Sequence, residues 1–276
     1  MDIYITLDVE GVTTVTNLEQ VRHGEPEFGA TRVLLTEEIN ASIEGALAAG
    51  VNAVLVNEGH GKHRNVIPKD LNRKAQLLTG RSKLFHLMHG IDRGFGAMFM
   101  IGYHAGAGKR YGILGHTFHA YNCTVNGRYM SEIGLCVALA GYYGVPTVLV
   151  TGDDESCRDA LNLVPNMETV AVKEGVSAAS AINLHPSVAQ EKIKEAAERA
   201  IKRLPEIKPF VIEPPLTMEL ELYSPLMGDM HDLIPGCVRT GDRSVRYQSD
   251  DFAELFKFFL LSSILSMTTY GLGVMV

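Results

Sequence analysis

Short apolar runs alternate with longer amphipathic stretches over the first two-thirds of the chain. Continuous or nearly continuous apolar runs of this length are typical of strands buried in a parallel sheet. Glu27–Ala49 and Ser131–Tyr142 carry apolar residues at helical spacing. This alternation predicts an α/β fold with a mostly parallel open sheet and flanking helices. The predicted strands are 2–7, 51–56, 75–78, 97–101 and 146–150.

The rest of the chain has a different pattern. Residues 117–126 look extended and are expected to form an antiparallel excursion. Ser187–Leu204 places its apolar residues on one helical face, and Pro186 is tolerated in the first turn. Four prolines within eleven residues then form a connector to a region that ends in a helix near Phe252. We therefore predict an α/β domain over residues 1–204, with a smaller α+β portion over residues 205–276 packed on it.

Composition excludes several classes of protein. The 276 residues are 46% hydrophobic and 21% charged, as in an ordinary soluble protein with a sizeable core. The net charge of −7, with no cluster of lysine or arginine, argues against nucleic-acid binding. The apolar stretch Phe258–Met267 is interrupted by serines and is too short to span a bilayer. Without a secretory signal or paired cysteine spacing, we expect a cytoplasmic protein with no membrane partner.

Two carboxylates at the end of the first predicted strand are the most informative polar residues. Asp8 and Glu10 stand two positions apart, so in an extended chain both side chains point to the same face. Two unpaired anions held together are costly unless a cation joins them. Two solvated acids at a strand-end turn are the competing interpretation.

Histidines follow two other predicted strands. His60 comes just after the 51–56 run, and His104 comes just after the 97–101 run. Because the carboxyl ends of parallel strands meet at one edge of an open sheet, we expect these histidines to face one crevice with Asp8 and Glu10. Carboxylate and imidazole ligands without thiolates suit zinc, manganese or a related divalent metal.

Glu132 and His116 extend this set, and each has an ordinary alternative. Glu132 opens the helix predicted over 131–142, where an acid commonly offsets the helix dipole. As a ligand, it would bring the set to three carboxylates and two histidines, which suits two metals with Asp8 bridging better than one tetrahedral zinc. His116 follows a glycine-rich loop and is either a general acid or base, or a surface-loop histidine.

Other polar residues near these motifs receive simpler interpretations. His63 is expected to contact solvent or substrate, and His86 and His89 are expected on a surface or interface helix. The acids at 153–155 are explained by capping and dipole compensation at the start of a helix.

Four short motifs together resemble the D-aminopeptidase family of zinc peptidases, peptidase family M55. The likeness continues through most of the chain. Glu58 departs from the aspartate of the family pattern, which puts a hydrogen bond that orients a ligand in question. The motifs are Asp8–Gly11, Asn57–His60, Gly102–His104 and Ser131–Leu135.

The resemblance implies specific roles for the residues singled out above. Asp8 would bridge two zinc ions, and His116 would be the catalytic residue. The family resemblance also implies cleavage of N-terminal D-amino acids from short peptides, inside a ring-shaped homodecamer with an internal chamber. The further zinc ligands implied are Glu10, His60, His104 and Glu132.

The sequence therefore predicts a metallo-aminopeptidase that hydrolyses peptides with metal-activated water. Two other functions stay open. Another two-metal hydrolase, such as an amidase or a phosphoesterase, would use the same ligands. A binding subunit in which the metals serve only to hold the fold together is the second alternative.

Overall fold

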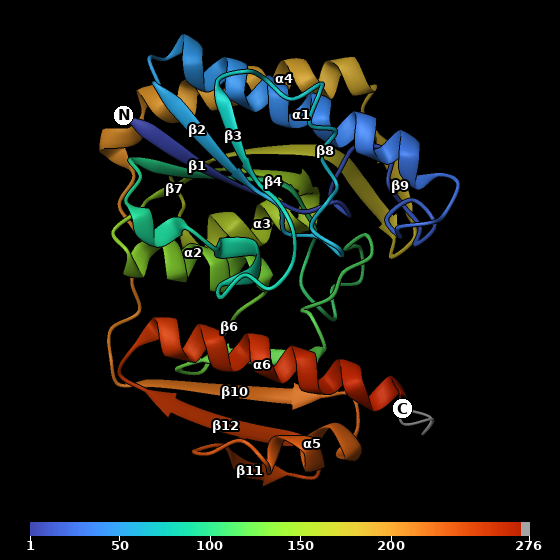
Figure 1. Ribbon diagram of the computed structural model, residues 1–276, viewed down its shortest axis with the longest axis vertical. Coiled ribbons are helices and arrows are strands. Elements are labelled where there is room, and N and C mark those ends of the chain that lie inside the picture. The colour runs from blue at the N-terminus through green and yellow to red at the C-terminus, as the bar shows by residue number, and fades with distance from the viewer. Residues whose placement is uncertain (272–276) are drawn as a thin grey trace.

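In the computed structural model, which describes residues 1–271, the first part of the chain folds around a seven-stranded sheet (Figure 1). The strand order is β3-β2-β1-β4-β7-β8-β9, and all neighbours pair in parallel except β8 with β9. The bounds are β1 Asp2–Leu7, β2 Ala53–Asn57, β3 Ala75–Leu78, β4 Ala97–Tyr103, β7 Thr147–Asp153, β8 Glu168–Ser177 and β9 Ser180–Asn183.

Helices cover both faces of this sheet. Helices α1 (Phe28–Ala48) and α4 (Pro186–Lys202) pack against each other on one face. Helices α2 (Glu132–Tyr142) and α3 (Asp154–Leu163) lie on the opposite face (Figure 1). Every residue of β4 is buried, as expected for a strand covered on both sides. The predicted fold class is confirmed.

A second sheet is antiparallel and has the order β11-β12-β10-β5-β6. The predicted antiparallel excursion is confirmed, because β5 and β6 come from residues 120–129. Those two strands precede residue 204, so this sheet is not confined to the predicted C-terminal portion. The division at residue 204 stays a prediction, and residues 272–276 lie outside the described part. The bounds are β5 Ala120–Val125, β6 Arg128–Tyr129, β10 Leu216–Leu222, β11 Val238–Gly241 and β12 Ser244–Ser249.

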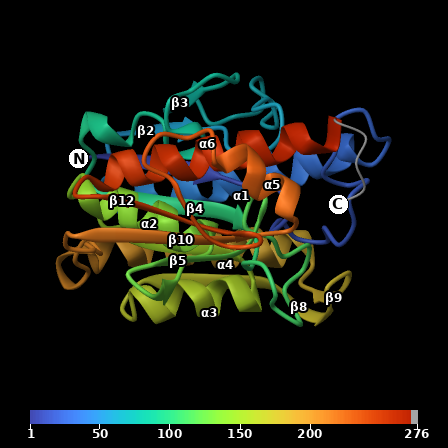
Figure 2. The same cartoon turned by 90° about the horizontal axis from the view of Figure 1, so that it is seen from below.

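The C-terminal helix α6 (Phe252–Gly271) is longer than the apolar stretch that predicts it. By length and composition alone, Phe252–Thr269 could cross a membrane; this window is longer than the apolar stretch Phe258–Met267 considered in the sequence. Most of that window is buried, and the helix packs against α2, β10, β12 and α5 (Pro225–His231), as Figures 1 and 2 show. This packing favours a core helix.

Strand ends differ from the sequence prediction for identifiable reasons. Strand β2 starts at Ala53 because the Val51 N–H donates to the Ala46 carbonyl oxygen (3.1 Å) and so closes α1. Strands β4 and β7 continue beyond their apolar runs. At a register irregularity between them, the Thr151 hydroxyl accepts the Gly102 N–H (3.0 Å), so a polar side chain completes the pairing.

The strand order sets the position of the site. In the sheet, β2 and β3 lie on one side of β1, and β4 and β7 lie on the other side. The carboxyl ends of β1 and β4 therefore flank the point where the strand order reverses, which is where open α/β sheets bind ligands.

Candidate metal centre

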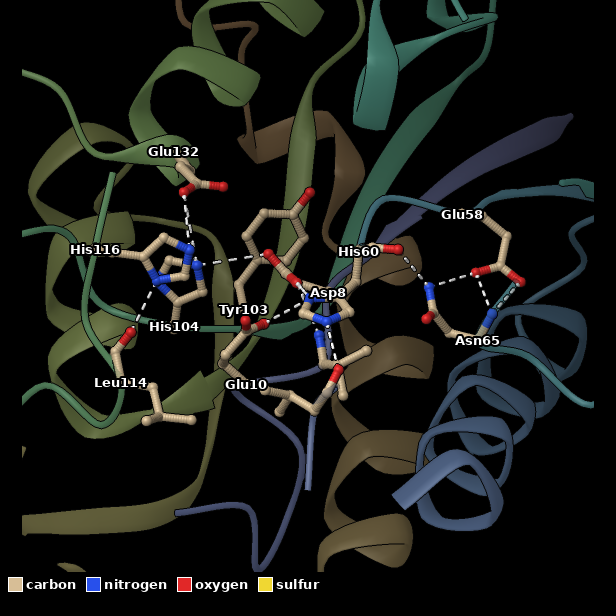
Figure 3. Close-up of polar contacts among 12 residues, drawn as sticks. Asp8, Glu10, Glu58, His60, Asn65, Tyr103, His104, Leu114, His116 and Glu132 are labelled. Carbon is tan, nitrogen blue, oxygen red and sulfur yellow. Dashed lines mark hydrogen bonds and ion pairs between the residues drawn. The ribbon is translucent and has the colours of Figure 1, made fainter. Parts of the chain in front are cut away.

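Four of the predicted site residues follow three adjacent strands (Figure 3). Asp8 and His104 come directly after β1 and β4, whereas Glu10 and His60 come three residues after β1 and β2. Asp8, Glu10 and His104 are buried, and His60 is nearly so. Their proximity follows from parallel pairing of β1 with both neighbours.

Glu132 and His116 reach the same place from other elements (Figure 3). Glu132 is the first residue of α2, whose N-cap Ser131 accepts the Gly134 N–H through its hydroxyl. The loop between β4 and β5 carries His116, whose side chain is 38% exposed, whereas that of Glu132 is 6% exposed. Glu132 thus lies inside the site, and His116 lies at its opening.

Close backbone approach fixes the two acids after β1. The Asp8 N–H donates to Ile101 O (2.9 Å), and the Gly11 N–H donates to Gly102 O (2.8 Å). A Cβ at Gly11 would lie 2.0 Å from the carbonyl oxygen of Tyr103. Glycine at position 11 is therefore required for the chain carrying Asp8 and Glu10 to lie against β4.

Asp8 lies between the two histidines. His60 Nδ1 is 3.1 Å from Asp8 Oδ1 and 3.0 Å from Glu10 Oε2. His104 Nε2 is 3.5 Å from Asp8 Oδ2 and 3.7 Å from Glu132 Oε1. Each oxygen of Asp8 therefore faces a different histidine, which is the arrangement that a bridging carboxylate needs.

The three histidines share one hydrogen-bonding pattern. One ring nitrogen of His60, His104 and His116 lies at hydrogen-bond distance from a backbone carbonyl oxygen. A carbonyl only accepts, so that nitrogen carries a proton. The other nitrogen faces the carboxylates, where a neutral ring would present its lone pair to a bound metal. Metal-ligating histidines are commonly oriented in this way. The acceptors are the carbonyl oxygens of Val21, Ala105 and Leu114, each at 2.8 Å.

The carboxylates strongly favour a cation here. Burial alone would lower the pKa of His104, but Asp8 and Glu132 raise it to about 10. Likewise, Glu10 and Asp8 overcome the effect of burial and raise the pKa of His60 well above its usual value. The same potential would attract a divalent metal, and within residues 1–271 the buried His104 Nε2 has no hydrogen-bond partner. The donor set therefore fits a metal.

The donor atoms form two groups that share one histidine. Within each group the candidate ligand atoms lie within 4.8 Å of one another. Apart from His116, the candidate ligands of both groups together with His60 are three carboxylates and two histidines, a set that suits two neighbouring ions better than one tetrahedral zinc. The ligand roles themselves stay predictions. The groups are Asp8, Glu10 and His104, and His104, His116 and Glu132.

Glu58 holds the segment that follows His60. Its carboxylate accepts hydrogen bonds from the backbone N–H and the side-chain amide of Asn65, and from the Val66 N–H. Asn65 in turn donates to the carbonyl oxygen of His60 (3.0 Å; Figure 3). Glutamate at this position thus supports His60 through its backbone, by way of one asparagine.

Two other histidines differ from their predicted surroundings. His63 is fully buried, and its Nε2 lies 2.8 Å from Nε2 of His86. Burial lowers the pKa of His63 to about 2 and that of His86 to about 4, so the pair is neutral. The expected solvent contact of His63 was wrong. Of the surface or interface helix expected around His86 and His89, the structure contains the three-residue 3-10 turn His86–Met88, packed beside His63.

Comparison with known proteins places the whole chain in one group. The family model described as D-aminopeptidase, peptidase M55, matches residues 1–261. A D-aminopeptidase of Bacillus subtilis (strain 168) is 32% identical over 274 residues, covering 98% of this chain and 99% of that protein. The solved structure of Zn-dependent D-aminopeptidase DppA from Bacillus subtilis, a self-compartmentalizing protease, is similar with a TM-score of 0.94. It is 30% identical, and the match covers 97% of this chain and 98% of that chain.

Proposed function

This chain belongs to the D-aminopeptidase family, peptidase family M55, and we propose that it is a two-zinc aminopeptidase acting on short peptides with an N-terminal D-amino acid. The zinc dependence and the D-specific activity of the relatives support the choice of metal and of substrate. The three carboxylates and two histidines gathered at one place are more ligands than one tetrahedral zinc takes, which supports two ions per chain.

The position of Asp8 carries this proposal. Its two oxygens face His60 and His104, and both rings use their other nitrogen on a backbone carbonyl. A pair of ions bridged by Asp8 would relieve the repulsion among the buried carboxylates and occupy the histidine lone pairs.

The histidine at the opening has the properties of a proton carrier. Bound zinc would activate water and polarise the scissile carbonyl. His116 stacks on His104 with ring centroids 4.0 Å apart, and its Nδ1 is held by Leu114 O. Its Nε2 therefore faces the site, 3.6 Å from Glu132 Oε1, where it can accept and return a proton.

The proposal extends to the assembly and location of the protein. Self-compartmentalization of the Bacillus relative supports a homo-oligomer, and the resemblance noted in the sequence supports a ring-shaped decamer. A chamber of this kind would admit short peptides rather than folded proteins. A cytoplasmic location is part of the same proposal.

Metal content and substrate preference test the function together. Elemental analysis of protein purified without chelator should give two zinc ions per chain. The protein should cleave D-Ala p-nitroanilide faster than L-Ala p-nitroanilide, and should not hydrolyse p-nitrophenyl phosphate. Phosphate ester turnover without amide cleavage, or protein that binds no metal, would overturn the proposal.

A further inference from the structure

Lys173 is a buried cation with no part in the chemistry above. It lies in β8, and its exposed fraction is 2%. Among the described residues it is the only lysine or arginine that is buried. Burying an ammonium is costly unless hydrogen bonds and opposite charges compensate, so its partners are informative.

All three donors of the ammonium go to one loop. Lys173 Nζ donates to the carbonyl oxygens of Glu10 (2.6 Å), Val12 (3.0 Å) and Val15 (2.6 Å). An ammonium carries three N–H groups and accepts nothing, so its capacity is used in full. The loop 10–15 begins at a candidate metal ligand and leads away from the site.

Other elements hold the same loop from different sides. Its Gly11 N–H donates to Gly102 O of β4, and its Thr13 N–H donates to Glu38 Oε1 of α1 (2.9 Å). Lys173 attaches the same loop to β8 through its three hydrogen bonds. The direction of the Glu10 side chain is therefore set by a loop that three elements fix.

The neighbouring acids give the ammonium a second connection to the site. Asp153 is the register partner of Lys173 in β7, and it contributes favourable charge beside the ammonium. The Asp153 carboxylate accepts the Ile113 N–H (2.7 Å), three residues before His116. The Lys173–Asp153 region thus contacts both the loop of Glu10 and the loop of His116.

We propose that Lys173 is a positioning residue for the metal centre, holding the Glu10 loop so that the Glu10 carboxylate faces the ions. The inference rests on the proposed function. An uncharged side chain of similar length would leave three carbonyl oxygens without their donor, and the loop would lose its attachment to β8.

The test compares Lys173→Met with Val172→Ala. Val172 is the adjacent, fully buried residue of β8, so its truncation costs stability while the Lys173 ammonium and its three hydrogen bonds to the loop are kept. Zinc affinity is measured by chelator competition on the full-length assembled protein, together with kcat and KM. Lys173→Met should lower zinc affinity about 10–100-fold and reduce kcat more than it changes KM. Val172→Ala should bind zinc as the wild type does.

Two more variants separate positioning from stability. Lys173→Arg keeps charge and donors and should recover part of the zinc affinity. Glu38→Ala releases the loop at Thr13 and should cause a smaller loss in the same direction, which keeps the test available if Lys173→Met does not fold. Wild-type zinc affinity in Lys173→Met, or in Glu38→Ala should the former not fold, would overturn the inference. A wild-type protein without zinc would instead overturn the proposed function.

Discussion

Gly11→Ala should disrupt the metal centre by a single methyl group. A Cβ at this position would lie 2.0 Å from the carbonyl oxygen of Tyr103 and 2.5 Å from the carbonyl carbon of Gly102, and real Cβ contacts essentially never fall below 3.0 Å. Both obstacles are backbone atoms of β4, so no side-chain rotation relieves the contact. The chain beside Glu10 must therefore move by about 1 Å relative to the strand that leads to His104.

The size of this movement sets the expected losses. Overpacking of this kind costs about 1–3 kcal/mol of unfolding free energy. A misplacement of about 1 Å in a catalytic arrangement costs about 100-fold in rate. We therefore expect the kcat of Gly11→Ala to fall about 100-fold. Its zinc affinity should fall as well, because the preceding residue is the candidate ligand Glu10.

The assay pairs zinc affinity and kcat with a matched control. Gly29→Ala introduces the same methyl group at an exposed position of α1, where no described atom lies within 4 Å of the new Cβ. It should keep wild-type activity and gain up to about 1 kcal/mol from helix propensity. Wild-type kcat and zinc affinity in Gly11→Ala would refute the reasoning.

Three further predictions concern variants of Asp8 and His116, removal of the metal, and the buried His231 of helix α5. Elemental analysis of Asp8→Ala should show that both zinc ions are lost. His116→Ala should keep both ions, and its kcat should fall by about 10²–10⁴-fold. Equal zinc content in the two variants would contradict the assignment of Asp8 as a ligand and His116 as the proton carrier. A chelator should lower the melting temperature, and added zinc should restore it. Zinc at about 1,000 times its Kd adds about 4 kcal/mol to the free energy of unfolding. A melting temperature that does not change with chelator would count against bound metal. Burial lowers the pKa of His231 below 6.5, so the unfolded state binds its proton more tightly and stability should fall as pH drops below about 6.5. Urea unfolding at about pH 7.5 and about pH 5.5 should show a smaller change in unfolding free energy for His231→Gln than for the wild type. An equal change would exclude His231 as the cause of the pH dependence.

The convergence of the site could be predicted because it depends on topology. Asp8, His60 and His104 follow parallel strands, and the carboxyl ends of such strands meet whatever the details of their packing. The apolar runs also located most strands of the first sheet. The ends of the strands were less predictable. Val51 donates its N–H to the end of α1 and so is not part of β2, and the Thr151 hydroxyl takes part in the pairing of β7 with β4.

The supporting contacts had no signal in the sequence. Backbone carbonyls orient His60, His104 and His116, and a backbone acceptor is present at every residue. Strand β8 was missed because it carries Lys173 and other charged residues in a pattern typical of solvent exposure. The burial of His63 depended on a partner, His86, that is distant in the chain.

The chain between β4 and β5 leaves one sheet and enters the other, and it carries His116 on the way. Strand β5 is paired on one side by β10, which is encoded about a hundred residues later. A truncated polypeptide ending before β10 would still contain every candidate metal ligand. It would nevertheless leave β5 as an open edge and free one end of the segment that carries His116, so the position of this histidine depends on a strand that contains no candidate ligand.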